Sequence, residues 1–189
     1  MTARRAPTRS AAPRKGPRRA GRAPSIAIDV AIPCARWRRA LPDTAHHAER
    51  AARAALSGAQ WRGTRGQAAE ISLVLAGDDA VRALNRRWRG RDSATNVLSF
   101  ASGEGGGDGR TVLLGDVVLA YETVAREAAE QGKPLADHFA HLVAHGVLHL
   151  LGFDHAKAAE ARRMEALERR VLARLGVGDP YRARDGADG

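Results

Sequence analysis

The sequence contains a single cysteine, Cys34, against seven histidines in 189 residues. One cysteine excludes an intramolecular disulfide framework and a zinc site built mainly from thiolates. The longest apolar runs, ISLVLAG and LVAHGVLHLLG, are far shorter than the roughly 20 residues that a membrane-spanning helix needs. We therefore expect a soluble protein without a membrane partner, in which any transition-metal ligands are histidines.

Acidic residues are absent from the first 24 positions, which hold seven arginines and one lysine. Eight of the ten net positive charges thus lie in a segment whose Ala, Pro, Gly and Arg offer little apolar surface to offset ordering entropy. We predict a disordered basic tail over residues 1–24, without the apolar segment of a secretory signal. Three interpretations stay open: a solvated or mis-assigned extension, an electrostatic tether for RNA, and an organelle transit peptide.

The rest of the chain is typical of one globular domain, which we place at residues 25–182, followed by a flexible tail at 183–189. Periodicity predicts strands near 25–32, 69–77, 95–100 and 111–120, and helices near 42–56, 78–90, 121–132, 134–151 and 156–175. The glycine-rich segment 101–110 predicts a mobile loop, and Gly115 a bulge or a close backbone approach. The fold class is therefore α+β, a small mixed β-sheet packed with helices that concentrate toward the C-terminus.

The segment HGVLHLLGFDH, which ends at His155, has the spacing of a metal site. Residues four apart share one face of a helix, so His145 and His149 can bind the same ion. A left-handed Gly152 would end the helix and bring His155 back over that face. Because three imidazoles with an open fourth position are typical of catalytic zinc, we predict one Zn²⁺ per chain on a zincin-like helix.

Two alternatives use the same helix. The set His141, His145 and His149 would span about 12 Å at 1.5 Å per residue, too far for one ion, so we expect His141 and His138 to pack or to support the ligands. The spacing HxxxHxxGxxH also occurs in metzincin proteases, where a glutamate after the first histidine is the general base. Gly146 stands there instead and cannot take a proton, which argues against peptide hydrolysis by that mechanism.

With these motifs the chain resembles the YbeY family, bacterial single-strand-specific endoribonucleases that mature ribosomal RNA. The resemblance rests on HGVLHLLGFDH, WRGRDSATNVLSF, LLGDVVL and EQGKPLADHFAH, and covers roughly residues 26–181. It implies zinc bound by His145, His149 and His155, and a role of Arg89 in activity. It also implies 16S ribosomal RNA 3′-end maturation and ribosome quality control in the bacterial cytoplasm. The implied partners are single-stranded ribosomal RNA, the small ribosomal subunit and its assembly factors.

The chemistry of these residues is compatible with that activity. A zinc ion lowers the pKa of a bound water to about 7 and polarises a phosphoryl oxygen. A guanidinium can hold a phosphate with two hydrogen bonds, so we predict Arg89 as a phosphate clamp, the alternative being one surface arginine among several. Asp154 could orient a histidine or accept a proton, as could Asp116, and a structural role is the alternative for both. The nucleophile, a metal-activated water or the 2′-hydroxyl of the RNA, stays open.

We therefore predict a zinc-dependent endoribonuclease. A ribosome-assembly factor with a mainly structural zinc is the principal alternative, and a metalloprotease-like hydrolase is a third, against which Gly146 argues. If the zinc is structural, His149→Ala would unfold the domain. If it is catalytic, the same change would abolish activity and leave the fold largely intact.

Overall fold

The computed structural model describes residues 25–61, 68–103 and 111–182; both predicted tails and most of the glycine-rich loop lie outside these ranges. The elements follow one another in this order: β1 (Ile26–Ala31), α1 (Arg36–Ala40), α2 (Thr44–Gly58), β2 (Ala68–Ala76), α3 (Asp78–Arg89), β3 (Val97–Ala101), β4 (Thr111–Ala120), α4 (Tyr121–Glu130), α5 (Leu135–Leu150) and α6 (Ala158–Leu175). Among the described helices, none combines the length and the apolarity of a membrane span.

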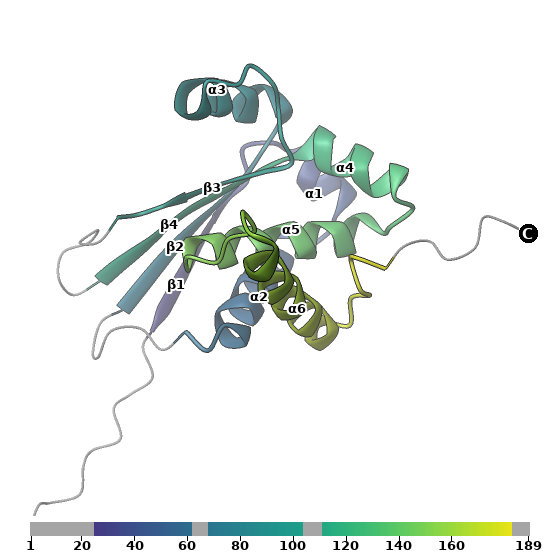
Figure 1. Ribbon diagram of the computed structural model, residues 1–189. Coiled ribbons are helices and arrows are strands. Elements are labelled where there is room, and N and C mark those ends of the chain that lie inside the picture. Colours follow the sequence, from purple (N-terminus) through teal and green to yellow (C-terminus); the bar gives the residue numbers. More distant parts are fainter. Residues whose placement is uncertain (1–24, 62–67, 104–110, 183–189) are drawn as a thin grey trace, which may run out of the picture.

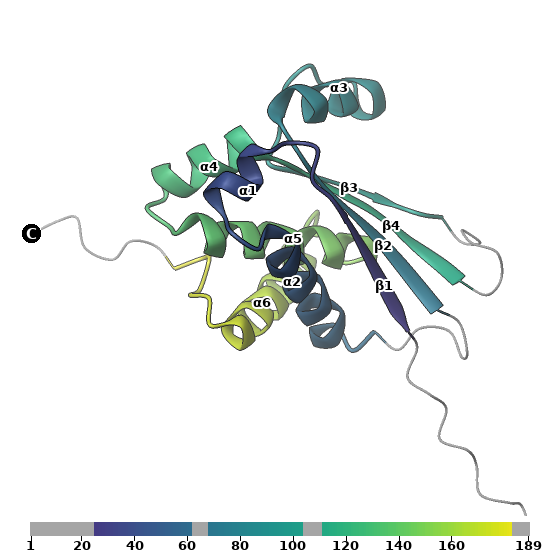
Figure 2. The ribbon, with the colours of Figure 1, turned by 180° about the vertical axis from the view of Figure 1, so that it is seen from behind.

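The four strands form one mixed sheet in the order β1-β2-β4-β3. Strands β1, β2 and β4 are parallel, and β3 runs antiparallel to β4 at the edge of the sheet. Helices α2 and α5 cover one face of the sheet, α6 packs against these two helices, and α3 lies on the other face (Figures 1 and 2). The predicted α+β class with a small mixed sheet is confirmed, and the predicted elements occur within two residues of their expected ends.

The main core fills the space between the sheet and helices α2, α5 and α6. Helix α5 is central to it, because nine of its 16 residues are buried. A helix that is apolar on most sides is stable only where other elements surround it. A smaller cluster under α3 comprises Ala76, Val81, Leu98, Val118 and Ala120.

Strand β4 contains the predicted irregularity at Gly115. The register against β2 shifts between Glu70 and Ile71, so Leu114 has no partner there. Gly115 has a φ of +133°, and a Cβ on it would lie 2.1 Å from the carbonyl oxygen of Phe100. Both expectations for this glycine, a bulge and a close backbone approach, are therefore confirmed.

Helix α1 was not predicted. It has only five residues, and three of them are arginines, so it shows no amphipathic period. Its anchor is Trp37, which is fully buried, donates a hydrogen bond from its indole Nε1 to the carbonyl oxygen of Ala76 at 2.9 Å, and packs edge-on against Tyr121. Tertiary contacts rather than local propensity stabilise this helix.

Candidate active site

The C-terminus of α5 reverses the chain as predicted. Gly152 has a φ of +83°, which places it in the left-handed region. Its N–H donates to the carbonyl oxygen of His149 at 3.0 Å, and the N–H of Phe153 donates to that of Leu148 at 3.1 Å. This pair of bonds is a Schellman motif, and the reversal brings His155 back toward the last turn of the helix.

The reversal gathers three histidines into one cluster. Nitrogens of His145, His149 and His155 lie within 4.8 Å of one another. The Nε2 atoms of His145 and His149 are 3.1 Å apart. His141 belongs instead to a second group, with His145 and Glu168, so the structure does not join His141 to His149. The structure thus assembles the favoured set of three, whose metal binding stays a prediction.

Glu168 on α6 supports this cluster and was missed by the sequence analysis. Its side chain is fully buried and accepts a hydrogen bond from Nδ1 of His145 at 2.7 Å and another from the hydroxyl of Tyr181. Burial alone would raise the pKa of Glu168, but its contacts with His141, His145 and Tyr181 outweigh burial and lower that pKa to about 2. Burial and the adjacent carboxylate raise the pKa of Tyr181. Glu168 is therefore an ionised acceptor.

The cluster fits a zinc ion by its donor chemistry. Because Glu168 accepts the Nδ1 proton of His145, the Nε2 of a neutral His145 carries the lone pair that a metal needs. Burial, with the neighbouring His145 and His155, lowers the pKa of His149 and favours its neutral, ligating form. Two nitrogens bound to one tetrahedral zinc at about 2.0–2.1 Å are about 3.3 Å apart, close to the spacing of His145 and His149.

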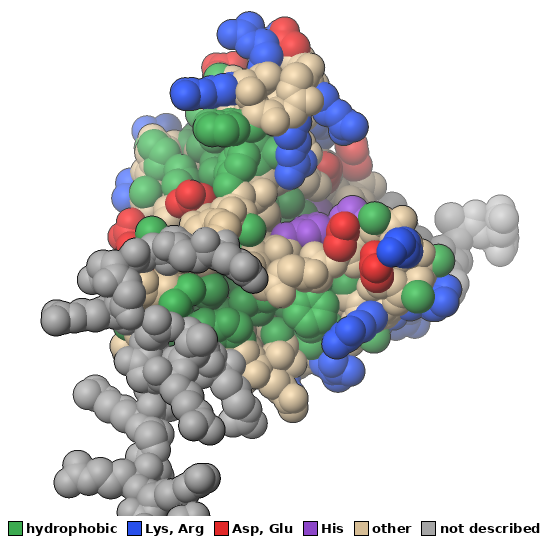
Figure 3. All heavy atoms as spheres, turned by 60° about the vertical axis from the view of Figure 1, so that its left-hand side comes forward, with side chains coloured by type: hydrophobic (Ala, Val, Ile, Leu, Met, Phe, Trp, Pro, Cys, Tyr) green, Lys and Arg blue, Asp and Glu red, His purple; other side chains and the backbone are tan. Residues whose placement is uncertain are grey.

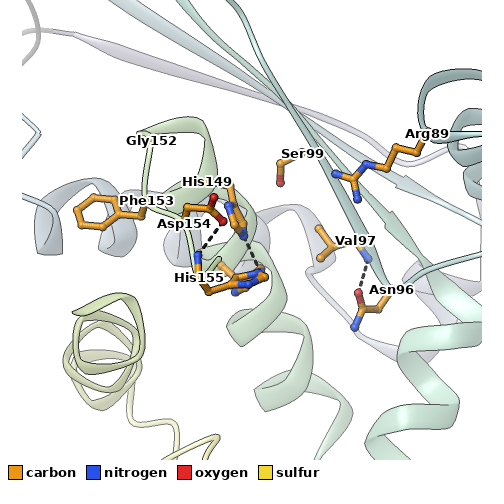
Figure 4. A pocket seen from close by; sticks show the side chains of 10 residues that line it. Arg89, Asn96, Val97, Ser99, His149, Gly152, Phe153, Asp154 and His155 are labelled. Carbon is orange, nitrogen blue, oxygen red and sulfur yellow. Dashed lines mark hydrogen bonds between the residues drawn. The ribbon is translucent and has the colours of Figure 1, made fainter. Parts of the chain in front are cut away.

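The three histidines line an open pocket of about 600 Å³, and Arg89 lines it as well. Arg89 is the last residue of α3, and Figure 4 shows its guanidinium pointing into the pocket across from the histidines. Arg86, Arg87 and Arg91 are not among the lining residues. Of the arginines in this segment, Arg89 alone is placed to contact a molecule bound at the cluster, and within the described chain it has no carboxylate partner.

The two candidate aspartates lie differently. Asp154 lines the pocket, and its carboxylate accepts the backbone N–H of His155 at 2.7 Å, which holds the turn that presents this histidine. Asp116 is exposed and does not line the pocket. Its neighbour Val117 points toward α5, so Asp116 faces the other side of the sheet. The structure therefore leaves Asp154 as a candidate and removes Asp116 from the site.

The pocket wall opposite the histidines comes from strand β3 and the residue before it. Asn96 and Ser99 line the pocket and were not singled out in the sequence. The amide of Asn96 donates to both carboxylate oxygens of Glu127 at 3.2 and 3.0 Å, and Glu127 also contacts Nε2 of His138 at 2.9 Å. His138 is buried and thus has the packing role, one of the two expected for it, at one end of a polar chain that reaches the pocket.

Gly146 has a structural role in this wall. It is buried, and a Cβ at this position would lie 2.5 Å from Cγ1 of Val117 and 3.2 Å from Oγ of Ser99. Helix α5 therefore approaches the sheet more closely than any other residue would allow. A glutamate at this position, as in the metzincin proteases, would have to displace Val117. The packing around residue 146 therefore disfavours the protease alternative, in addition to the lack of a general base there.

Fold and site together define an α+β protein whose open pocket holds three histidines that could bind a metal ion, beside an arginine without a carboxylate partner in the described chain. The family model described as Endoribonuclease YbeY matches residues 37–176. The chain belongs to this family.

Curated relatives agree with this assignment, and a solved structure has a similar fold. An Endoribonuclease YbeY of Paramagnetospirillum magneticum is 52% identical over 161 residues, which cover 83% of this chain and 96% of that protein. Another, of Methylocella silvestris, is 62% identical over 113 residues, which cover 60% of this chain and 63% of that protein. The solution structure of TM1509 from Thermotoga maritima has a TM-score of 0.51 and 18% identity, and covers 84% of this chain and 99% of its own. The last likeness concerns the fold alone.

Proposed function

We propose that this protein is a zinc-dependent endoribonuclease that cleaves single-stranded RNA. The observation that carries the proposal is the placement of Arg89 opposite His145, His149 and His155 across one pocket. The relatives named Endoribonuclease YbeY support the reaction class. The open pocket supports a catalytic rather than a structural metal, because a structural zinc site is usually closed by four protein ligands.

Each residue has a distinct task in this proposal. The three histidines hold the zinc ion, which supplies Lewis acidity at the phosphoryl group. Arg89 binds a non-bridging phosphate oxygen and stabilises the charge that develops there in the transition state. Asp154 keeps His155 in place through the backbone N–H of that histidine. Glu168 fixes the ring of His145 and keeps its proton on Nδ1.

The proposed physiological substrate is ribosomal RNA. We infer that the protein acts in the cytoplasm on the 3′ end of 16S ribosomal RNA and in ribosome quality control, together with the small ribosomal subunit and its assembly factors. Membership in the YbeY family supports this inference. RNA from immature small subunits incubated with the purified protein should be shortened at its 3′ end, and an unchanged end would contradict it.

The test of the activity compares wild type, Arg89→Ala and His155→Ala purified side by side, with a labelled single-stranded RNA. We expect about one bound zinc in wild type and Arg89→Ala, and cleavage at least about a hundredfold slower in Arg89→Ala, because removal of one charge-stabilising donor typically costs that much. Cleavage should also stop when a chelator removes the metal and return on zinc addition. Equal activity in all three proteins would point to a contaminating nuclease and overturn the proposal.

The same samples separate the catalytic from the structural zinc. If the ion is catalytic, its removal should leave the fold largely intact, because the hydrophobic core between the sheet and the helices does not include His145, His149 or His155. Circular dichroism of His149→Ala and of chelated wild type should therefore retain the helical signal. Loss of that signal would favour the assembly-factor alternative with a structural zinc.

A further inference from the structure

A second cavity, of about 420 Å³, lies beside the active-site pocket, between the last turn of α2 and helix α6. Phe153 lines both cavities, so they share a wall. Three arginines of α6, Arg163, Arg170 and Arg174, line the second cavity. Their spacing of seven and four residues puts them on one side of the helix, and we refer to them as the α6 arginine face.

The charges of the α6 arginine face are not neutralised within the described chain. None of the three forms an ion pair with a described carboxylate, and no described acidic residue lines the cavity. Arg169, on another side of the same helix, pairs instead with Glu165 at 3.6 Å and Asp179 at 3.2 Å. Like charges four residues apart on a helix repel each other, so an anion bound between Arg170 and Arg174 would relieve a built-in cost.

The cavity has a firm wall. Helix α2 approaches α6 so closely at Gly58 that a Cβ there would lie 2.4 Å from Cγ2 of Val171. Val171 is fully buried, as a packing contact between the two helices requires. The backbone that carries the α6 arginine face is thus held in place, so that only the arginine side chains have to be ordered when a ligand binds.

The two cavities lie next to each other, with Phe153 between them, beside the histidine cluster. Figure 4 shows Arg89 and Phe153 on opposite sides of the histidines. Lysine and arginine side chains lie on both sides of the histidines at the surface (Figure 3). The guanidinium of Arg163 lies 5.6 Å from the ring centroid of Phe153, which joins an aromatic surface to a positive charge at the junction. Grooves for single-stranded nucleic acid combine these two features.

We propose that the α6 arginine face binds the phosphates of single-stranded RNA that extends from the cleaved bond past Phe153. The proposal rests on the endoribonuclease function and adds to it the direction in which the substrate leaves the metal site. Arg163 and Arg174 are separated by about 16 Å along the helix, at 1.5 Å per residue, so the face serves several nucleotides. A single small anion would contact at most two of these arginines, such as Arg170 and Arg174, whereas a phosphodiester backbone can use all three.

The test measures binding of zinc-loaded protein to labelled 2′-O-methyl oligonucleotides, which are single-stranded and resist cleavage, by fluorescence anisotropy. One oligonucleotide has about 4 nucleotides and the other about 16, the two ends of the usual range of site sizes. In Arg170→Ala/Arg174→Ala we expect the long oligonucleotide to bind on the order of tenfold more weakly and the short one as in wild type. The slope of log affinity against log salt should fall by about 1.4, or about 0.7 for each lost phosphate contact.

The matched control is Arg39→Ala/Arg162→Ala, which removes the same charge from surface positions outside both cavities. Equal weakening in control and test variants would overturn the proposal, because it would show only the effect of net charge. Unchanged binding of the long oligonucleotide would also overturn it. If that result came with a lower melting temperature, the arginines would instead stabilise the last carbonyls of α2.

The outcomes also separate this inference from the proposed function. Wild type that cleaves single-stranded RNA while Arg170→Ala/Arg174→Ala binds the long oligonucleotide equally well would overturn this inference alone. Wild type that neither cleaves such RNA nor binds either oligonucleotide would overturn both. The charge reversal Arg174→Glu provides a second variant, for which we expect a larger loss of long-oligonucleotide affinity than for Arg174→Ala.

Discussion

At the residue scale, Glu168 is the side chain outside the three histidines that should contribute most to the proposed metal affinity. It is fully buried, ionised and bound to Nδ1 of His145 at 2.7 Å. We expect Glu168→Gln to weaken zinc binding on the order of tenfold or more, because carboxylates that orient metal-binding histidines typically contribute that much. A competitive titration against a chromophoric chelator measures the affinity.

The control for this prediction is Glu160→Gln on the same helix. Glu160 is partly exposed, and its one ion pair among the described residues is with Lys157, at 3.6 Å, so its neutralisation should leave the zinc affinity unchanged. If Glu168→Gln bound zinc as tightly as Glu160→Gln, the hydrogen bond to His145 would not support the metal site.

Gly146 carries a second prediction at this scale. Alanine in place of glycine favours a helix by about 1 kcal/mol, but the added Cβ overlaps the buried Val117, and overpacking typically costs about 1–3 kcal/mol. We therefore expect Gly146→Ala to lower the free energy of unfolding by about 1 kcal/mol, and Gly146→Glu by more. Thermal or urea unfolding measures both.

A smaller residue at position 117, on the sheet, should reduce the destabilisation caused by Gly146→Ala. In the double variant Gly146→Ala/Val117→Ala the steric overlap is gone, so the two changes together should cost less than the sum of their separate costs. Additive costs would show that the close approach of α5 to β4 does not limit the size of residue 146.

At the scale of elements, the N-termini of α3 and α4 are joined by reciprocal hydrogen bonds. The carboxylate of Asp78 accepts the backbone N–H of Thr123 at 3.0 Å and its hydroxyl at 2.8 Å. In return, Glu122 accepts the N–H of Asp78 at 2.9 Å and forms an ion pair with Arg36. Helix α3 lies on the face of the sheet opposite the main helices, so these bonds help to fix the helix that carries Arg89 at its other end.

We expect Asp78→Ala to lower the free energy of unfolding by about 1 kcal/mol, as the loss of a helix cap does, and to slow RNA cleavage because Arg89 loses a fixed support. Unfolding and single-turnover cleavage measure the two effects. Asp79→Ala is the comparison, because Asp79 lies in the same first turn but makes no side-chain hydrogen bond within the described chain. The prediction is wrong if the two variants have the same stability and rate.

The elements themselves were largely predictable from the sequence, because their signals are local. Apolar periods mark the strands and helices, and Gly152 and Gly176 end helices with a positive φ. Helix α1 was missed because its one anchor, Trp37, is stabilised by residues far along the chain. Glu168 was missed for the same reason: it is 23 positions from His145, and only the packing of α6 against α5 brings them together.

The three histidines could be proposed from sequence because a single helix end and one turn contain them. Arg89 entered through family resemblance, since nothing local distinguishes it from its neighbouring arginines. The structure adds the distinction, because only Arg89 of that segment reaches the pocket. The place of Asn96 in the pocket wall could not be predicted, because it depends on a hydrogen bond to Glu127, which lies far along the chain in helix α4.

At the scale of the whole molecule, a polar chain links the start of β3, helix α4 and helix α5 through Asn96, Glu127 and His138. Burial lowers the pKa of His138 below its usual 6.5, although Glu127 acts in the opposite direction. In the unfolded chain this histidine takes up its proton first as the pH falls. Its contribution to stability is therefore complete above pH of about 6.5 and declines as the pH falls toward the lower folded pKa.

We expect wild type to lose stability below pH of about 6.5 more steeply than His138→Gln, whose amide cannot titrate but can still bind Glu127. The difference in slope cannot exceed about 1.4 kcal/mol per pH unit, the value for one proton. Urea unfolding of the two proteins without metal, over a series of pH values, measures it. Since His149 is present in both, its own titration does not affect the comparison, and parallel pH profiles would contradict the prediction.

The order of the parts along the chain has a consequence for synthesis. The sheet and Arg89 come first, then the three histidines, and last Glu168 and Tyr181, which complete the support of His145. A chain emerging from the ribosome in this order lacks the support of His145 until the segment that holds Glu168 and Tyr181 has also been made. The proposed zinc affinity would therefore reach its full value only after α6 has packed against α5 and Glu168 has met His145.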